Sequence, residues 1–113
     1  MNELSLFRID LYSRQPHVLK DFYEEALGLR LTHNTDGGST YELSGGRMQL
    51  VITRSVHEVK NRVRICFQTP DFKNYKQMLT IRNIPITATK VKEGRFFFEL
   101  KDPDGNEVAV YQV

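Results

Sequence analysis

The chain has 113 residues, enough for one domain with its own apolar core. Its 16 basic and 14 acidic residues are mixed along the sequence and give a formal net charge of +2, so no basic block indicates nucleic-acid binding. No apolar run approaches the roughly 18 residues of a membrane span, and the start lacks a signal-peptide pattern. The single cysteine, Cys66, excludes an intrachain disulfide. These features predict a cytoplasmic protein without membrane or nucleic-acid partners.

The first half of the chain begins with a strand-like stretch over residues 4–12. A helix is expected over residues 15–27, because apolar residues recur at every fourth position from Val18 to Ala26 and form one stripe. Gly28 is typical of the left-handed residue that ends a helix. Three strand-like segments separated by glycine-containing turns follow at residues 29–34, 39–44 and 47–54.

The second half repeats this order. Residues 62–68 read as a strand, and Thr69 with Pro70 suggests an N-cap followed by the proline favoured in the first turn. Apolar residues over 72–79 form the stripe of a helix, and Asn83 takes the place of glycine at its end. Three more strands are expected at residues 85–91, 95–100 and 106–112, the last two joined by the turn sequence DPDG.

The pattern therefore predicts an α+β fold: a single domain over residues 1–113 made of two βαβββ modules, at about 1–55 and 61–113. Because side chains alternate between the faces of a strand, each module has an apolar side under its helix and a mixed polar side. The two mixed sheets can curl so that the polar sides line a cup-shaped cavity. The candidate ligand-binding residues on those polar sides are Arg8, Asp10, Tyr12, Gln49, Arg64, Gln68 and Tyr111.

Two motifs carry a resemblance to a known family. The segment FYEEALGLRL follows the first strand, and DPDGNEVAVYQ lies at the end of the chain. With the doubled module plan, they make the sequence similar to the vicinal oxygen chelate superfamily, which includes glyoxalase I, extradiol dioxygenases and the fosfomycin- and bleomycin-resistance proteins. The resemblance implies a cup-shaped site between two modules, in a protein that is usually a homodimer.

The same resemblance implies where metal ligands would lie. The four positions carried over from metal-dependent members are Arg8, Gln49, Arg64 and Ala109. A divalent metal needs imidazole or carboxylate donors, whereas arginine is a permanent cation and alanine has no donor atom. Only Gln49 offers a weak carbonyl ligand. We therefore expect no metal, no other cofactor and no catalytic residue.

Three functions compete at this point. The first is a metal-free protein that binds a small, anionic molecule in its cup through the seven polar residues. The second is a metal-dependent glyoxalase-type lyase or isomerase, or a dioxygenase, with altered ligands. The third is a structural or regulatory dimer whose cup is filled because Arg8 and Arg64 form internal ion pairs. The acidic candidates for those pairs are Asp10, Glu99 and Glu107.

Overall fold

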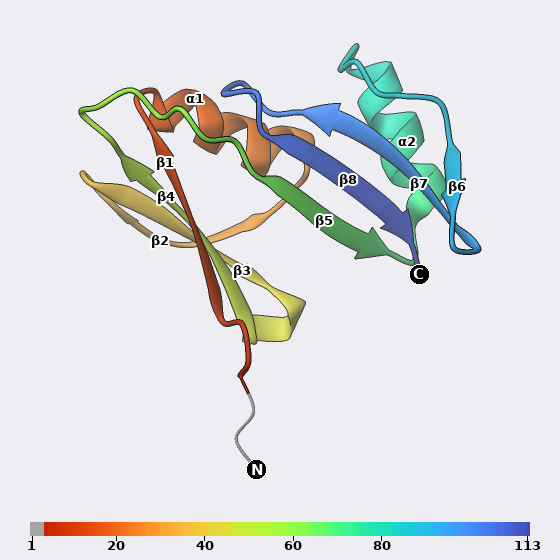
Figure 1. The fold of residues 1–113 in the computed structure, drawn as a ribbon, viewed down its shortest axis with the longest axis horizontal. Coiled ribbons are helices and arrows are strands. Elements are labelled where there is room, and N and C mark those ends of the chain that lie inside the picture. The colour runs from red at the N-terminus through yellow and green to blue at the C-terminus, as the bar shows by residue number, and fades with distance from the viewer. Residues whose placement is uncertain (1–3) are drawn as a thin grey trace. The chain divides into compact units, whose positions relative to one another are not determined.

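The computed structural model of the chain describes residues 4–113. It consists of two compact units, with the boundary in the sequence between Val59 and Lys60. Each unit contains one four-stranded mixed sheet and one helical segment, which confirms the α+β fold class and the βαβββ order (Figure 1). Within residues 4–113 no helix is both long enough and apolar enough to cross a membrane.

The first unit has the strand order β1-β4-β3-β2. Strand β1 runs parallel to β4, and the other neighbours are antiparallel. The first strand can pair with the last because the helical segment crosses back over the sheet. Its elements are β1 (Arg8–Ser13), α1 (Pro16–Asp21), the π-helix η1 (Phe22–Ala26), β2 (Arg30–Thr35), β3 (Gly38–Leu43), the 3-10 helix η2 (Ser44–Gly46) and β4 (Met48–Arg54).

The second unit has the equivalent order β5-β8-β7-β6, again with its first strand parallel to its last. Strand β8 pairs antiparallel with β7, and β7 with β6. The repeat predicted from the sequence pattern is therefore a repeat of topology. Its elements are β5 (Arg64–Thr69), α2 (Phe72–Ile81), β6 (Lys90–Lys92), β7 (Arg95–Lys101) and β8 (Glu107–Gln112).

Each unit has an apolar core between its sheet and its helix. In the first unit, Leu19 and Tyr23 of the helical segment are fully buried, as is Ile52 of β4. In the second unit, Phe72 of α2 packs on Phe98 of β7, with ring centroids 5.3 Å apart. Burying such side chains is the main favourable term in folding, so the apolar face of each sheet holds the unit together and leaves the opposite face available for other contacts.

The helical segment of the first unit differs from the expected regular helix. It changes from α to π geometry at Phe22, and the Leu27 N–H donates to the Phe22 carbonyl at 3.3 Å. The extra residue in the turn brings Tyr23, Ala26 and Leu27 all into the core. Gly28 then adopts a left-handed φ of 71°, which confirms it as the helix end.

In the second unit, two expected boundaries shift, and a threonine hydroxyl accepts a backbone N–H near each of them. The helix α2 begins at Phe72, not at Pro70, and the Thr69 hydroxyl accepts a hydrogen bond from the Asp71 N–H at 3.0 Å. The strand expected over residues 85–91 is reduced to β6. Before β6, the Thr87 N–H donates to the Glu99 carbonyl at 2.9 Å, and the Thr87 hydroxyl accepts the Glu99 N–H at 2.9 Å, so a side-chain oxygen takes the place of one backbone acceptor beside β7.

The predicted turn DPDG is part of a buried polar network with the asparagine that follows it. Asp102 is 4% exposed, and its carboxylate accepts hydrogen bonds from the Asp104 N–H, the Asn106 N–H and the Asn106 amide, at 3.0, 2.9 and 2.9 Å. The Asn106 Oδ1 accepts the Val63 N–H at 3.0 Å. The network thus links the β7–β8 turn to the residue that precedes β5.

Candidate functional site

Four of the seven predicted residues lie on the polar face of the first sheet. Arg8, Asp10 and Tyr12 alternate along β1, and Gln49 of β4 pairs with Arg8 in the register. The Arg8 Nε lies 2.9 Å from the Asp10 Oδ1, but that oxygen has no aligned hydrogen bond, so the contact is an ion pair only. Tyr12 is 55% exposed. This face therefore presents one neutralised ion pair, an amide and an exposed phenol.

The other three predicted residues lie on the polar face of the second sheet. Arg64 and Gln68 belong to β5, and Tyr111 of β8 pairs with Gln68. The register sets Glu107 opposite Arg64, and Ala109 opposite Cys66. Glu107 therefore occupies the place that Gln49 has in the first sheet, where Gln49 pairs with Arg8. Counting from the DPDGN motif does not reveal this relation, because it depends on how β5 and β8 are aligned.

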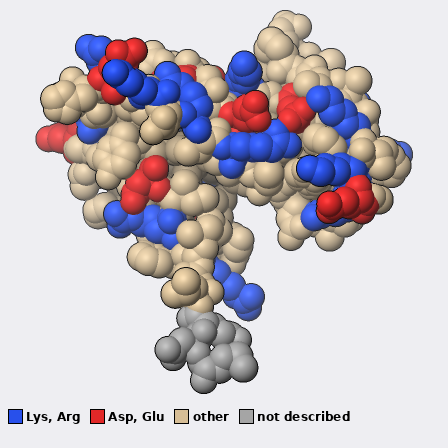
Figure 2. Space-filling view, in the orientation of Figure 1, with Lys and Arg blue, Asp and Glu red and all other residues tan. Residues whose placement is uncertain are grey.

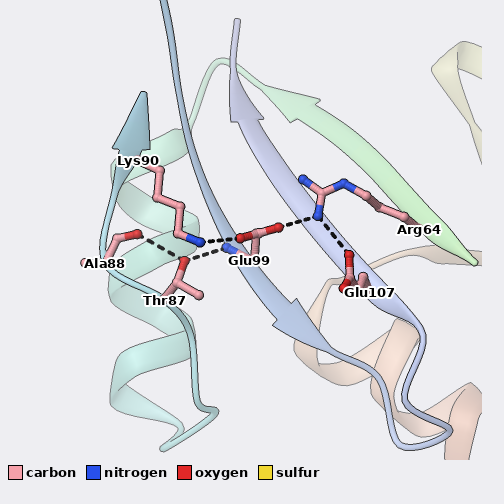
Figure 3. Close-up of polar contacts among 6 residues, drawn as sticks. All are labelled: Arg64, Thr87, Ala88, Lys90, Glu99 and Glu107. Atoms are coloured by element: carbon pink, nitrogen blue, oxygen red, sulfur yellow. Dashed lines mark hydrogen bonds and ion pairs between the residues drawn. The ribbon is translucent and has the colours of Figure 1, made fainter. Parts of the chain in front are cut away.

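Arg64 belongs to a group of four charged residues, which we call the Arg64 cluster: Arg64, Lys90, Glu99 and Glu107 (Figure 3). The Arg64 Nη1 donates to Glu99 and, at 3.0 Å, to Glu107. The Lys90 Nζ donates to the other Glu99 oxygen at 2.6 Å. Two cations thus face two carboxylates, and their formal charges cancel. Figure 2 shows the same intermixing of basic and acidic side chains over the strands of the second unit.

Ion pairing favours the charged forms of Glu99 and Arg64. The hydrogen bond from Lys90, followed by that from Arg64, lowers the pKa of Glu99 below its usual value. The hydrogen bonds to Glu99 and then Glu107 raise the pKa of Arg64 above that of an ordinary guanidinium. Arg64 is therefore already committed to protein carboxylates, which limits what it can offer to an external anion.

The lowered pKa of Glu99 predicts how the free energy of unfolding changes as the pH falls. A carboxyl group with a depressed folded-state pKa stabilises the protein above its unfolded pKa and loses this effect as the pH falls through its folded pKa. We expect Glu99→Gln to reduce the free energy of unfolding at pH 7, and the difference from the original protein to shrink below about pH 4.3, the ordinary glutamate value. Urea unfolding from pH 7 to pH 3 measures this.

The matched control for that measurement is Glu58→Gln. Glu58 is exposed, and within residues 4–113 it has no ion-pair partner. This substitution should leave the unfolding free energy nearly unchanged at every pH. A Glu99→Gln difference that stayed constant down to pH 3 would contradict the ion-paired arrangement.

A pocket of ≈ 330 Å³ lies on the polar face of the second sheet, and its lining includes two predicted residues. Arg95 at the start of β7 crosses over it: its Nη2 donates to the Gln68 Oε1 at 2.9 Å and to the Gln112 carbonyl at 3.2 Å. The guanidinium carbon lies 5.1 Å from the centre of the Tyr111 ring. The full lining is Cys66, Phe67, Gln68, Lys92, Glu93, Arg95 and Tyr111.

Arg95 was not among the residues predicted from the sequence, whereas Phe97 was expected to belong mostly to the core and to be able to form a pocket wall. Phe97 stacks on Tyr111 with ring centroids 4.8 Å apart and planes 18° from parallel. Arg95, Phe97 and Glu99 are spaced by two residues, so strand alternation places them on one face. This two-residue spacing can be read from the sequence alone. The pairing of Phe97 with Tyr111, which brings them to the pocket, comes only from the register.

The register changes one of the four positions that the resemblance implied for metal ligands: the counterpart of Gln49 in the second sheet is Glu107, whose carboxylate is paired with Arg64, and not Ala109. The side chains predicted at those positions are poor donors for a divalent cation. Arg8 and Arg64 are cations engaged with carboxylates, and Ala109 is fully buried and has no donor atom. Within residues 4–113, no three His, Cys, Asp or Glu side chains gather where they could hold a metal ion.

Two βαβββ units with these mixed sheets define the glyoxalase, bleomycin-resistance and dioxygenase class of fold, the vicinal oxygen chelate superfamily predicted from the motifs. Residues 7–111 match the profile of the Glyoxalase-like domain, and the chain belongs to that family. A comparison with curated proteins by sequence found no match.

Solved structures share the fold at low sequence identity. A lactoylglutathione lyase from Agrobacterium tumefaciens is 18% identical with a TM-score of 0.82, over 98% of this chain and 95% of that one. The antibiotic-binding protein TnmS3 from Streptomyces sp. CB03234 is 20% identical with a TM-score of 0.84, over 99% and 98%. The oxidase ChaP-H2 is 12% identical with a TM-score of 0.82, over 97% and 94%. At these identities the likeness concerns the fold alone.

Proposed function

We propose that this protein is a metal-free member of the glyoxalase-like family that binds a small molecule, preferably an anionic one, in the cytoplasm without converting it. The observation that carries the proposal is the set of side chains at the four positions that the resemblance assigns to metal ligands: Arg8, Gln49, Arg64 and Ala109. The Glu107 carboxylate, which takes the place of Gln49 in the second sheet, is paired with Arg64. These four side chains are poor donors for a metal ion, and two arginine cations disfavour one, while the second sheet keeps a pocket with polar and aromatic walls.

The pocket supports binding on grounds of size and composition. Its volume of ≈ 330 Å³ lies at the lower end of the range for small-molecule sites, about 300–1,000 Å³. Gln68 supplies an amide, Tyr111 a phenol with an apolar ring, and Arg95 a planar cation. Similar folds include an antibiotic-binding protein as well as a lyase and an oxidase, so the fold is compatible with binding alone. The side chains, not the fold, favour binding here.

The first test concerns the metal. We expect the purified full-length chain to hold no stoichiometric transition metal after incubation with zinc, nickel, manganese or iron(II) salts followed by gel filtration, because only Gln49 among the four positions can donate. Elemental analysis by mass spectrometry measures the metal content. About one tightly held ion per chain would contradict the proposal and favour the metal-dependent lyase, isomerase or dioxygenase.

The second part of the test concerns binding itself. A library of cationic, neutral and anionic aromatic compounds is screened by amide chemical shifts on chelator-treated protein. Compounds that shift the amides of Gln68 and Tyr111 without added metal support the proposal. If no compound binds, or if binding requires a metal salt, the proposal fails.

One set of contacts favours a structural or regulatory alternative. Arg8 pairs with Asp10, and Arg64 pairs with Glu99 and Glu107, which are the internal pairs expected for a filled cup. Each sheet also has two edge strands that tend to be covered, so we propose a homodimer under either function. A dimer in sedimentation equilibrium that binds none of the screened compounds would favour the alternative, and a monomer would contradict it.

A further inference from the structure

We propose that Arg95 is the anion anchor of the pocket on the second sheet, and that the ligand class is a flat aromatic compound carrying a carboxylate. This inference rests on the proposed function, because it assigns the ligand of the same pocket. It moves the anion from Arg8 and Arg64, the two arginines predicted from the sequence, to Arg95. Arg8 is paired with Asp10, so the two arginines to compare are Arg64 and Arg95 on the second sheet.

Electrostatics distinguish the two arginines. Arg64 contacts two carboxylates, and the Arg64 cluster has no net charge. Arg95 has no carboxylate partner within residues 4–113: its Nη2 contacts are the neutral Gln68 amide and the Gln112 carbonyl. Its Nη1 and Nε groups have no partner in that part of the chain. Among the pocket residues Lys92 and Arg95 outnumber Glu93, which leaves one net positive charge.

The contacts of Arg95 also orient it for binding. Two hydrogen bonds hold Nη2, and the Tyr111 ring lies under the guanidinium. A planar guanidinium held in this way loses little freedom when it forms further hydrogen bonds, and it matches the geometry of a carboxylate. A lysine side chain could not both stack on the Tyr111 ring and present several N–H donors in one plane, as a guanidinium does. Arg95 is thus a preorganised cation whose remaining donors are available to a ligand.

The aromatic preference follows from the pocket wall beside Arg95. Tyr111 is half-buried and stacks on Phe97, so its ring is held in a fixed plane. A flat ligand ring can contact this phenol and the nearby Cys66 side chain while its acidic group reaches Arg95. An anion without an aromatic ring would contact only the Arg95 guanidinium. A neutral aromatic compound would contact only the pocket wall formed by Tyr111 and Cys66.

The experiment uses 2-naphthoate as the probe and the 113-residue chain. We expect 2-naphthoate to bind more tightly than its neutral counterpart 2-naphthamide and the non-aromatic cyclohexanecarboxylate, and to shift the amides of Gln68, Arg95 and Tyr111. Arg95→Ala should weaken 2-naphthoate binding about ten- to a hundredfold, the loss expected for one charge-assisted contact. Arg95→Lys should give an intermediate loss, because charge is kept but the planar fork is not.

Lys73→Ala is the matched control, since it removes one positive charge from α2 without touching the pocket lining. It should leave 2-naphthoate affinity unchanged, and urea unfolding checks that every variant is folded. Unchanged affinity in Arg95→Ala, or equal weakening in Lys73→Ala, overturns the role of Arg95. Binding of only neutral or cationic library compounds at the Gln68 and Tyr111 amides overturns the ligand class and the preference for an anion, but leaves metal-free binding without conversion standing as the function.

Discussion

Asn106→Ala is expected to lower the free energy of unfolding by about 2–4 kcal/mol, because it breaks a buried network that joins two parts of the second unit. The substitution removes the acceptor of the Val63 N–H and one donor to Asp102. Asn106 is 6% exposed and Asp102 4%, so water cannot easily replace the lost partners. A buried polar group left without a partner costs more than an average hydrogen bond contributes.

Urea unfolding at pH 7 measures this effect, and Asn61→Ala is the control. Asn61 is exposed, and its side chain makes no contact in the network around Asp102. Substitution at such a surface site should change stability by less than about 0.5 kcal/mol. Equal effects of the two substitutions would mean that Asn106 does not secure the turn to the start of β5.

Alanine substitutions at the three consecutive phenylalanines of β7 are expected to lower the free energy of unfolding by different amounts, according to how deeply each ring is buried. Phe98 is fully buried against Phe72, and Phe98→Ala should cost about 3–5 kcal/mol through lost burial and the cavity left behind. A domain of this size is stable by only about 5–15 kcal/mol, so the variant should unfold at much lower urea concentration. Circular dichroism during urea titration gives the change.

Its neighbours provide internal controls with the same chemistry. Phe96 is 48% exposed, so Phe96→Ala should cost about 1 kcal/mol or less. Phe97 is 7% exposed and stacks on Tyr111, so Phe97→Ala should fall between the other two and should also weaken 2-naphthoate binding. If Phe96→Ala destabilised the protein as much as Phe98→Ala, the assignment of strand faces would be wrong.

Much of the fold could be predicted from the sequence because it depends on residues that are close in the chain. The alternation of β1 and β5 placed Arg8, Asp10 and Tyr12 on one face and Arg64 and Gln68 on another, as the structure has them. Helix ends also followed from single residues: both Gly28 and Asn83 adopt positive φ. The expectation that no metal binds also rests on residue type, since an arginine side chain offers no donor atom to a cation, and it stays a prediction that the metal analysis tests.

Only the tertiary structure decided which side chains meet across strands. The register of β5, β7 and β8 sets Glu107 opposite Arg64 and brings Phe97 to Tyr111, and a shift of one residue would move every one of these side chains to the other face. The position of Arg95 over Tyr111 arises in the same way, because β7 and β8 are aligned by the buried Asp102 and Asn106 network. Local pattern therefore determined which residues face the site, while cross-strand packing determined which arginine is neutralised and which remains available to a ligand.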